Sequence, residues 1–335
     1  MFSKLKGIIP ARVKDATKHK ESAPAVGTRI AFSIPGEPED GFLSQIALFD
    51  LALRQMSQPL RDARVIAHLR GGEATVVPLR WRPHLKNVEL RFIKPAPDQK
   101  PAYATQAMDR FRINEPDLDV VILCDADTLL LGGIDDVLRQ LALGTPVAGV
   151  IAHFPPPDFQ DPNQDWRDLS KRIIGSSVTL LHPYTLVDPN LVQGQDRPLA
   201  PFYLNHGFLA FRADALKEFS RRYIDMRARV AGHMTKYPQF VGQVSLTLTQ
   251  HELGWKPAAL PMRYNFPNDA RALDLHKYEA GDIRVLHYLR ERSYKRNELS
   301  SSDTAFYRFM KLELDAADRI VQSALQRITG GEYPF

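Results

Sequence analysis

Residues 120–131 read Val-Val-Ile-Leu-Cys-Asp-Ala-Asp-Thr-Leu-Leu-Leu, an apolar run interrupted by two carboxylates, Asp125 and Asp127. The aliphatic and β-branched residues predict a buried strand that delivers both acids to its end. Because alternate side chains of an extended chain point to the same side, both carboxylates can turn toward one divalent cation that prefers oxygen ligands. An isolated pair of this spacing is also compatible with a solvated turn.

Segments with strand and helix character alternate on both sides of this run. Strand character is found in residues 29–34, 64–69, 88–93 and 147–151, and helical spacing of apolar residues in 42–56, 102–113 and 134–143. Repeated alternation predicts an α/β fold with a mainly parallel central sheet flanked by helices. Ligands of such sheets bind at the carboxyl ends of the strands, which is where Asp125 and Asp127 fall.

The chain is expected to form one main domain with an extension at each end. Residues 1–27 are predicted to be a basic, flexible tail, residues 28–295 the main domain, and residues 296–335 a C-terminal helical appendage. The appendage is indicated by an amphipathic pattern over residues 303–328 that stops at Gly330.

The composition excludes several classes of protein. Hydrophobic residues make up 44% of the chain and charged residues 25%, which is ordinary for a soluble globular protein. No run reaches the roughly 18 apolar residues that a membrane span needs. The net charge of +5 is modest, and the basic residues are not interleaved with aromatic ones as in nucleic-acid binders. The single cysteine, Cys124, permits no internal disulfide, which favours a cytoplasmic protein.

Basic residues are concentrated in the first twenty positions, at Lys4, Lys6, Arg12, Lys14, Lys18 and Lys20. With the apolar residues between them they could form a weak amphipathic helix at an anionic membrane surface. A disordered basic tail is equally compatible with the sequence, because Pro10 interrupts the segment. Peripheral membrane contact through this tail therefore stays an open alternative.

Three later segments follow the D-x-D run in a specific order: Tyr-Leu-Asn-His-Gly-Phe-Leu-Ala-Phe at 203–211, Val-Gly-Gln-Val-Ser-Leu at 241–246 and Val-Leu-His-Tyr at 285–288. Together with residues 123–129 they resemble the GT-A-fold glycosyltransferases of family 8, the glycogenin-like and lipopolysaccharide galactosyltransferase-like enzymes. The resemblance covers roughly residues 100–290. It implies the GT-A fold of nucleotide-diphospho-sugar transferases.

The resemblance also implies roles for individual residues. Manganese, or magnesium, would be bound by Asp125, Asp127 and His287. Gln243 would lie beside the anomeric carbon and Asn205 in the sugar pocket, as the two residues assigned to catalysis. Donor binding would fall on Tyr103, Asp125, Ala126, Asp127 and Gly207. Ser33 and Ile34 are added from their position after the first strand, and Lys295 from a basic run that could reach the diphosphate. Chemistry independently favours such a set, because a cation that bridges a diphosphate stabilises the charge of the leaving group.

The chain departs from the family pattern at four places. Aspartates that flank the glutamine in the family are replaced by Gly242 and Val244. The Asp-containing nucleotide loop after the first strand is replaced by Ile-Pro-Gly at 34–36. Thr105 stands where the family often has arginine, with Arg110 as a replacement. The Lys-Pro-Trp segment after the histidine is replaced by a basic run: Arg290, Arg292, Lys295 and Arg296.

These features predict metal-dependent transfer of a hexose from a nucleotide sugar, by resemblance a uridine diphosphate sugar, to an unidentified acceptor with retention. The acceptor could be a glycan, a lipid-linked sugar or a protein. A non-catalytic sugar-nucleotide-binding protein is the first alternative, because the flanking aspartates are missing. A haloacid-dehalogenase-type phosphatase is the second, although its motif requires threonine or valine where this chain has Leu129.

Overall fold

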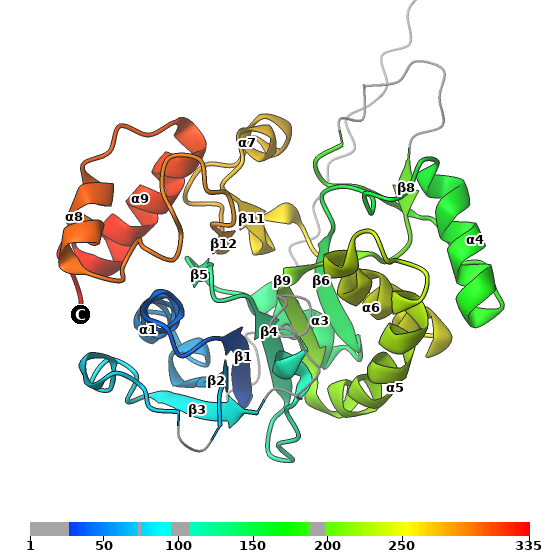
Figure 1. The fold of residues 1–335 in the computed structure, drawn as a ribbon, viewed down its shortest axis with the longest axis horizontal. Helices are drawn as coiled ribbons and strands as arrows, with labels where there is room; N and C mark the ends of the chain where they lie inside the picture. Colours follow the sequence, from blue (N-terminus) through cyan, green and yellow to red (C-terminus); the bar gives the residue numbers. More distant parts are fainter. Residues whose placement is uncertain (1–26, 73–74, 95–107, 188–197) are drawn as a thin grey trace, which may run out of the picture.

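The computed structural model (Figure 1) describes residues 27–72, 75–94, 108–187 and 198–335. A seven-stranded sheet has the order β10-β6-β9-β4-β1-β2-β3. Its strands are β1 (Ile30–Gly36), β2 (Arg64–Arg70), β3 (Val88–Ile93), β4 (Val120–Cys124), β6 (Val147–Ile151), β9 (Leu204–Arg212) and β10 (Ala258–Ala259). Strand β9 is antiparallel to both of its neighbours, and the other neighbouring strands are parallel. The predicted mainly parallel central sheet is confirmed.

Helices cover both faces of this sheet (Figure 1). One face packs on α1 (Asp40–Arg54) and α3 (Asp135–Ala142), and the other on α4 (Pro162–Ile174), α5 (Ala213–Ala231) and α6 (Val241–Glu252). The side chains of β4 alternate between the two cores: Ile122 and Cys124 face the α1 side, and Val121 and Leu123 the α5 side. The central strand is therefore apolar throughout because both of its faces are buried.

A second, three-stranded sheet has the order β11-β12-β5 and is built from β5 (Thr128–Leu130), β11 (Phe266–Pro267) and β12 (Val285–His287). Strand β5 begins directly after the D-x-D pair and runs antiparallel to β12, with Thr128 opposite His287. This pairing places residues that are far apart in sequence at one point. The remaining elements are β7 (His182–Pro183), β8 (Leu199–Ala200), α7 (Ala270–His276) and short 3-10 helices at Leu60–Asp62, Leu79–Trp81, Asp109–Phe111, Pro238–Phe240 and Met262–Tyr264.

The single C-terminal helix predicted over residues 303–328 is in fact two helices, α8 (Asp303–Met310) and α9 (Ala316–Thr329). Each has its own N-cap: Ser302 accepts a hydrogen bond from Ala305 N, and Asp315 accepts one from Asp318 N. Both helices bury their apolar faces in the same core, so the apolar periodicity continues across the break and conceals it.

The other predicted helix that differs is 102–113. Residues 102–107 lie outside the described part of the chain, and Asp109–Phe111 forms a single 3-10 turn. Most of the basic tail over residues 1–27 also lies outside the described residues. Within the described residues, no helix combines the length and apolarity that crossing a membrane would require.

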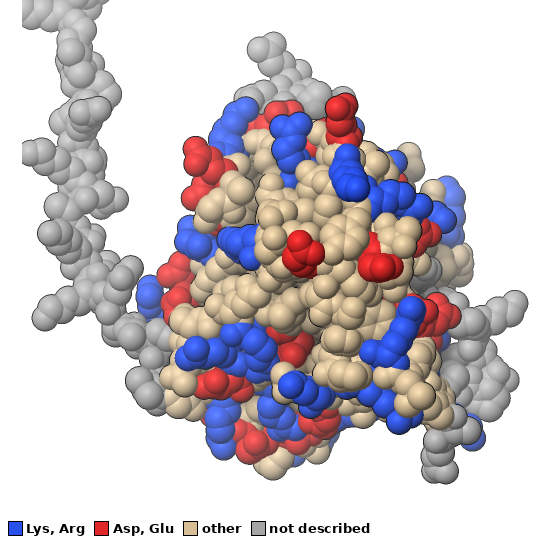
Figure 2. Space-filling view, turned by 90° about the vertical axis from the view of Figure 1, so that its left-hand side faces the viewer, with Lys and Arg blue, Asp and Glu red and all other residues tan. Residues whose placement is uncertain are grey.

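Charges of both signs are mixed on the face of the molecule that carries α8 and α9. Figure 2 shows Lys and Arg side chains interspersed with Asp and Glu around a mostly uncharged central area that includes acidic side chains. This face therefore has no continuous basic surface of the kind that nucleic-acid binding requires.

Candidate functional site

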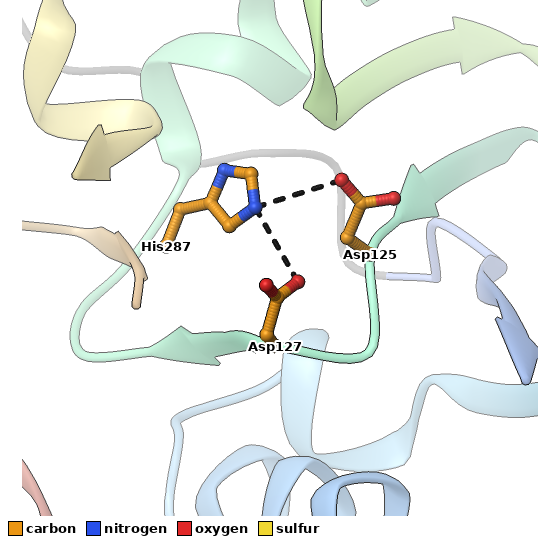
Figure 3. Close-up of side chains that lie close together, drawn as sticks. All are labelled: Asp125, Asp127 and His287. Atoms are coloured by element: carbon orange, nitrogen blue, oxygen red, sulfur yellow. Dashed lines mark ion pairs between the residues drawn. The ribbon is translucent and has the colours of Figure 1, made fainter. Parts of the chain in front are cut away.

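The acids Asp125 and Asp127 occupy the short connection between β4 and β5, and His287 ends β12 (Figure 3). The imidazole Nε2 lies 3.5 Å from Asp125 Oδ2 and 3.3 Å from Asp127 Oδ1. One ligand atom from each of the three residues lies within 4.8 Å of the others. The structure therefore brings the three residues expected to bind a metal together at one point.

Backbone hydrogen bonds fix this arrangement. Asp125 N donates to Gly207 O at 3.3 Å, and Tyr288 N donates to Asp127 O at 3.0 Å. The Thr128 hydroxyl donates to Asp125 O at 2.7 Å and closes the turn between the two strands. The positions of both carboxylates are thus set by β9, β12 and β5 together.

Gly207 is the point at which β9 passes the imidazole. A Cβ atom at this position would lie 2.3 Å from His287 Nδ1 and 2.6 Å from Asn265 Oδ1. No side chain fits there, so the Asn-x-Gly segment serves here to let β9 approach the histidine. Asn205 Oδ1 accepts hydrogen bonds from Gly207 N and Asn265 Nδ2, both at 2.8 Å.

The electrostatics of the three residues are tightly linked. Burial alone would lower the pKa of His287, but the attraction of Asp127 and Asp125 outweighs it and raises that pKa. Burial would raise the pKa of Asp125, but Arg110 and His287 outweigh it and the pKa is lowered. In the same way His287 and Arg296 lower the pKa of Asp127 against the effect of its burial. Both carboxylates are therefore ionised, as metal ligands must be.

Each acid is also paired with one arginine. The Arg110 guanidinium contacts Asp125, and the Arg296 guanidinium contacts Asp127. The Arg110 side chain is 3% exposed and that of Arg296 33%. Arg110 is held from behind because its Nη1 donates to His206 O at 3.0 Å. Two fixed cations therefore balance the two acids.

The set of donor atoms fits a divalent metal ion. Two carboxylates and one imidazole offer oxygen and nitrogen ligands that suit Mn²⁺ or Mg²⁺, and a group of three ligands leaves room for further oxygen ligands. Among the described residues, His287 Nδ1 and Asn265 Oδ1 have no hydrogen-bond partner, and both lie near the point that a Cβ atom at Gly207 would occupy.

A cavity of about 450 Å³ opens over the acids. It is lined by Pro35, Phe42, Gln45, Arg110, Asp125, Ala126, Asp127, His206, Gln239, Phe240, Gln243, Glu291, Lys295, Arg296 and Asn297. Its size is within the range of small-molecule sites. Four of its sides come from the start of α1, the β4–β5 connection, the start of α6 and the segment after β12.

The other predicted site residues are distributed unequally around this cavity. Ala126, Gln243 and Lys295 line it. Ser33 and Ile34 are buried within β1, and Pro35 forms the wall in their place. The Ser33 hydroxyl donates to Arg110 O at 2.8 Å and so supports a residue that does reach the site.

Asn205 and Gly207 are not among the residues that line the cavity and lie behind it, against His287 and Asn265. Tyr103 lies outside the described residues.

Sequence reasoning missed several residues of this cavity. Phe42 and Gln45 come from the first turns of α1, and Gln239 and Phe240 precede α6. None of these belongs to a recognisable motif, and only the fold brings them to the site. His206 could have been found, because it lies inside the quoted segment 203–211.

No protein-family model and no curated protein matches this chain. Among solved structures it is similar to mouse xyloside xylosyltransferase 1, with a TM-score of 0.45 and 11% identity over 78% of this chain and 97% of the other. The galactosyltransferase LgtC in complex with donor and acceptor sugar analogues gives a TM-score of 0.46 and 16% identity over 92% and 97%. The glycosyltransferase GlyE of Streptococcus pneumoniae gives 0.47 and 12% over 92% and 66%.

Proposed function

We propose that this protein is a metal-dependent glycosyltransferase that moves a hexose from a nucleotide sugar to an acceptor. The proposed nucleotide sugar is a uridine diphosphate sugar. The observation that carries the proposal is the convergence of Asp125, Asp127 and His287, because the two acids of this group line a cavity that basic side chains also line. The acceptor belongs to the class of glycans, lipid-linked sugars or proteins with a free hydroxyl.

Asp125, Asp127 and His287 would hold Mn²⁺ or Mg²⁺. A bound cation would supply a Lewis acid for the departing diphosphate, so the leaving group would not need to be protonated. The arginine paired with each acid would also contribute to donor binding. Arg110 and Arg296 both line the cavity, where their guanidinium groups would contact phosphate oxygens of the donor as well as the acids.

Gln243 is the proposed sugar-facing residue. Its Oε1 accepts a hydrogen bond from the Tyr203 hydroxyl at 2.8 Å, which fixes the orientation of the amide. Gln243 lines the cavity, so in this proposal its amide N–H groups donate to a sugar hydroxyl. Gln243 carries no charge, and a retaining transfer in which the acceptor hydroxyl enters on the side of the leaving phosphate is compatible with such a group.

The proposal is tested by a screen of nucleotide sugars in the presence of Mn²⁺, scored by release of free nucleotide. Asp127→Asn removes a charged ligand with almost no change of shape. We expect turnover to fall at least about 100-fold, because electrostatic stabilisation of the leaving group is lost. Asp225→Asn, on the exposed side of α5, is the matched control and should keep wild-type turnover. Unchanged turnover in Asp127→Asn would refute the proposal.

The same screen separates catalysis from binding alone. Gly242 and Val244 beside Gln243 leave the sugar without flanking carboxylates, which is the feature that favours a non-catalytic sugar-nucleotide-binding protein. Calorimetry that shows Mn²⁺-dependent binding of a nucleotide sugar, with no nucleotide release against any acceptor class, would select that second function.

A further inference from the structure

Residues 288–296 connect two groups that touch the same carboxylate. His287 Nε2 lies 3.3 Å from Asp127 Oδ1, and the Arg296 guanidinium contacts Asp127 from the other end of the segment. Lys295 from this segment also lines the cavity. The conformation of residues 288–296 therefore decides where a cationic side chain stands relative to the metal ligands.

Asn268 forms hydrogen bonds with the segment 288–296. It is fully buried, and its Oδ1 accepts a hydrogen bond from Arg290 N at 2.9 Å. The two N–H bonds of its Nδ2 are shared among three acceptors, of which Arg290 O and the Tyr294 hydroxyl both lie at 3.0 Å. One side chain thus bonds both the backbone N–H and the backbone carbonyl of Arg290, and it also contacts the Tyr294 hydroxyl. The neighbouring Asp269 adds an ion pair to Arg290 Nε at 3.1 Å.

Asp318 holds Asn268 from the side of α9. It is fully buried, and its Oδ1 accepts a hydrogen bond from Asn268 Nδ2 at 2.8 Å. Asn268 follows β11, Asp318 belongs to α9, and the segment 288–296 follows β12, so the contact joins three parts of the chain. A buried carboxylate is costly for stability unless its partners compensate it. Such a group is better explained by a need to fix one conformation than by a gain in stability.

We propose that Asn268 and Asp318 are positioning residues that hold segment 288–296 in the conformation that places Arg296 at Asp127, and thereby set the affinity of the site for the diphosphate of the donor. This inference rests on the proposed function. Neither residue touches the donor, and both act through Arg296.

The test compares Asn268→Ala with a matched control from the same region. The Nε2 of Gln322 likewise shares its two N–H bonds among three acceptors, Phe309 O, Met310 O and Leu312 O at 3.1 to 3.2 Å, but none of these residues lines the cavity. Calorimetry with uridine diphosphate and Mn²⁺ should show about tenfold weaker binding in Asn268→Ala and wild-type binding in Gln322→Ala. That loss corresponds to one lost charge-assisted contact.

Two further variants distinguish positioning from general destabilisation. If Asn268 acts through Arg296, the double variant Asn268→Ala/Arg296→Ala should bind no more weakly than Arg296→Ala alone. Asp318→Asn keeps an oxygen that can accept from Asn268 and should bind like wild type, whereas Asp318→Ala should lose as much as Asn268→Ala. Losses that multiply in the double variant, or wild-type binding in Asn268→Ala, would overturn the inference.

A measurement without nucleotide keeps this inference separate from the proposed function. In hydrogen exchange, the amides of residues 290–296 should lose protection in Asn268→Ala and keep it in Gln322→Ala. Unchanged protection would overturn the positioning role. If the wild-type protein binds none of the nucleotides tested with Mn²⁺, the proposed function fails, and the exchange result alone decides whether Asn268 holds the segment.

Discussion

At the scale of single residues, the site depends on a balance of charge around two acids. Asp125 and Asp127 each contact His287 and one arginine, so the half-buried Asp125 and the buried Asp127 both have compensating partners. A divalent cation added to this set leaves an excess of positive charge beside the cavity. That excess is what a diphosphate requires, and it is largest when the cation and both arginines are present together.

The close packing of Gly207 against His287 allows a prediction about metal binding. A methyl group there would lie 2.3 Å from His287 Nδ1, so Gly207→Ala must displace the imidazole from the acids. We expect Mn²⁺ affinity, measured by calorimetry, to fall about 10- to 100-fold, the range found when metal-bound histidines lose their orientation. Gly281→Ala is the control, because a Cβ there meets nothing within 4 Å. Equal Mn²⁺ affinity in both variants would mean that His287 is not a ligand.

At the scale of elements, the position of a strand in the sequence was easier to predict than the distant strand with which it pairs. The apolar run of β4 predicts a doubly covered strand, and the structure confirms it. The pairing of β5 with β12 is a contact across more than 150 residues and leaves no local pattern. The position of His287 beside the acids was therefore predicted only from the resemblance. The break between α8 and α9 was missed because both helices share one apolar face.

The start of α6 supports a prediction about Gln243. Tyr203→Phe removes the hydroxyl that donates to Gln243 Oε1, without opening a cavity. We expect the free energy of unfolding in urea to fall by about 1 kcal/mol and sugar-nucleotide turnover to fall several-fold, because the amide loses its fixed orientation.

Tyr184→Phe is the matched control for this variant. The hydroxyl of Tyr184 accepts from Trp166 Nε1 at 2.8 Å in the same core, away from the cavity. It should lose similar stability and keep wild-type turnover. If both variants lose turnover equally, Tyr203 supports the core and does not orient Gln243.

At the scale of the whole molecule, the cavity is assembled from elements that the central sheet and the small sheet bring together. Asp127 could be placed at the site from the strand-end pair of carboxylates, and Gln243 only from the resemblance of its segment to a known family; both line the cavity. Wall residues such as Phe42 and Gln45 could not be predicted, because their place depends on how α1 packs over the sheet. Ser33 shows the intermediate case: its strand was predicted, but in the structure it supports Arg110 and does not line the cavity.

The stability of the whole molecule should depend on pH through buried neutral histidines, of which His68 on β2 is the clearest. It is 1% exposed, and neither ring nitrogen has a hydrogen-bond partner among the described residues. Burial, together with Arg91 and Arg112, lowers the pKa of His68 to about 3 from 6.5. Between these values the unfolded chain binds the extra proton, so stability is complete above about pH 6.5 and is lost as the pH falls toward 3. By pH 5 the protonation of this one group in the unfolded chain lowers the free energy of unfolding by about 2 kcal/mol.

The test is urea unfolding at pH 7 and pH 5. His68→Phe should remove this part of the loss of stability between the two pH values, and His233→Phe, at an exposed position, should not. Equal acid losses in wild type and His68→Phe would show that His68 is not held neutral by the fold.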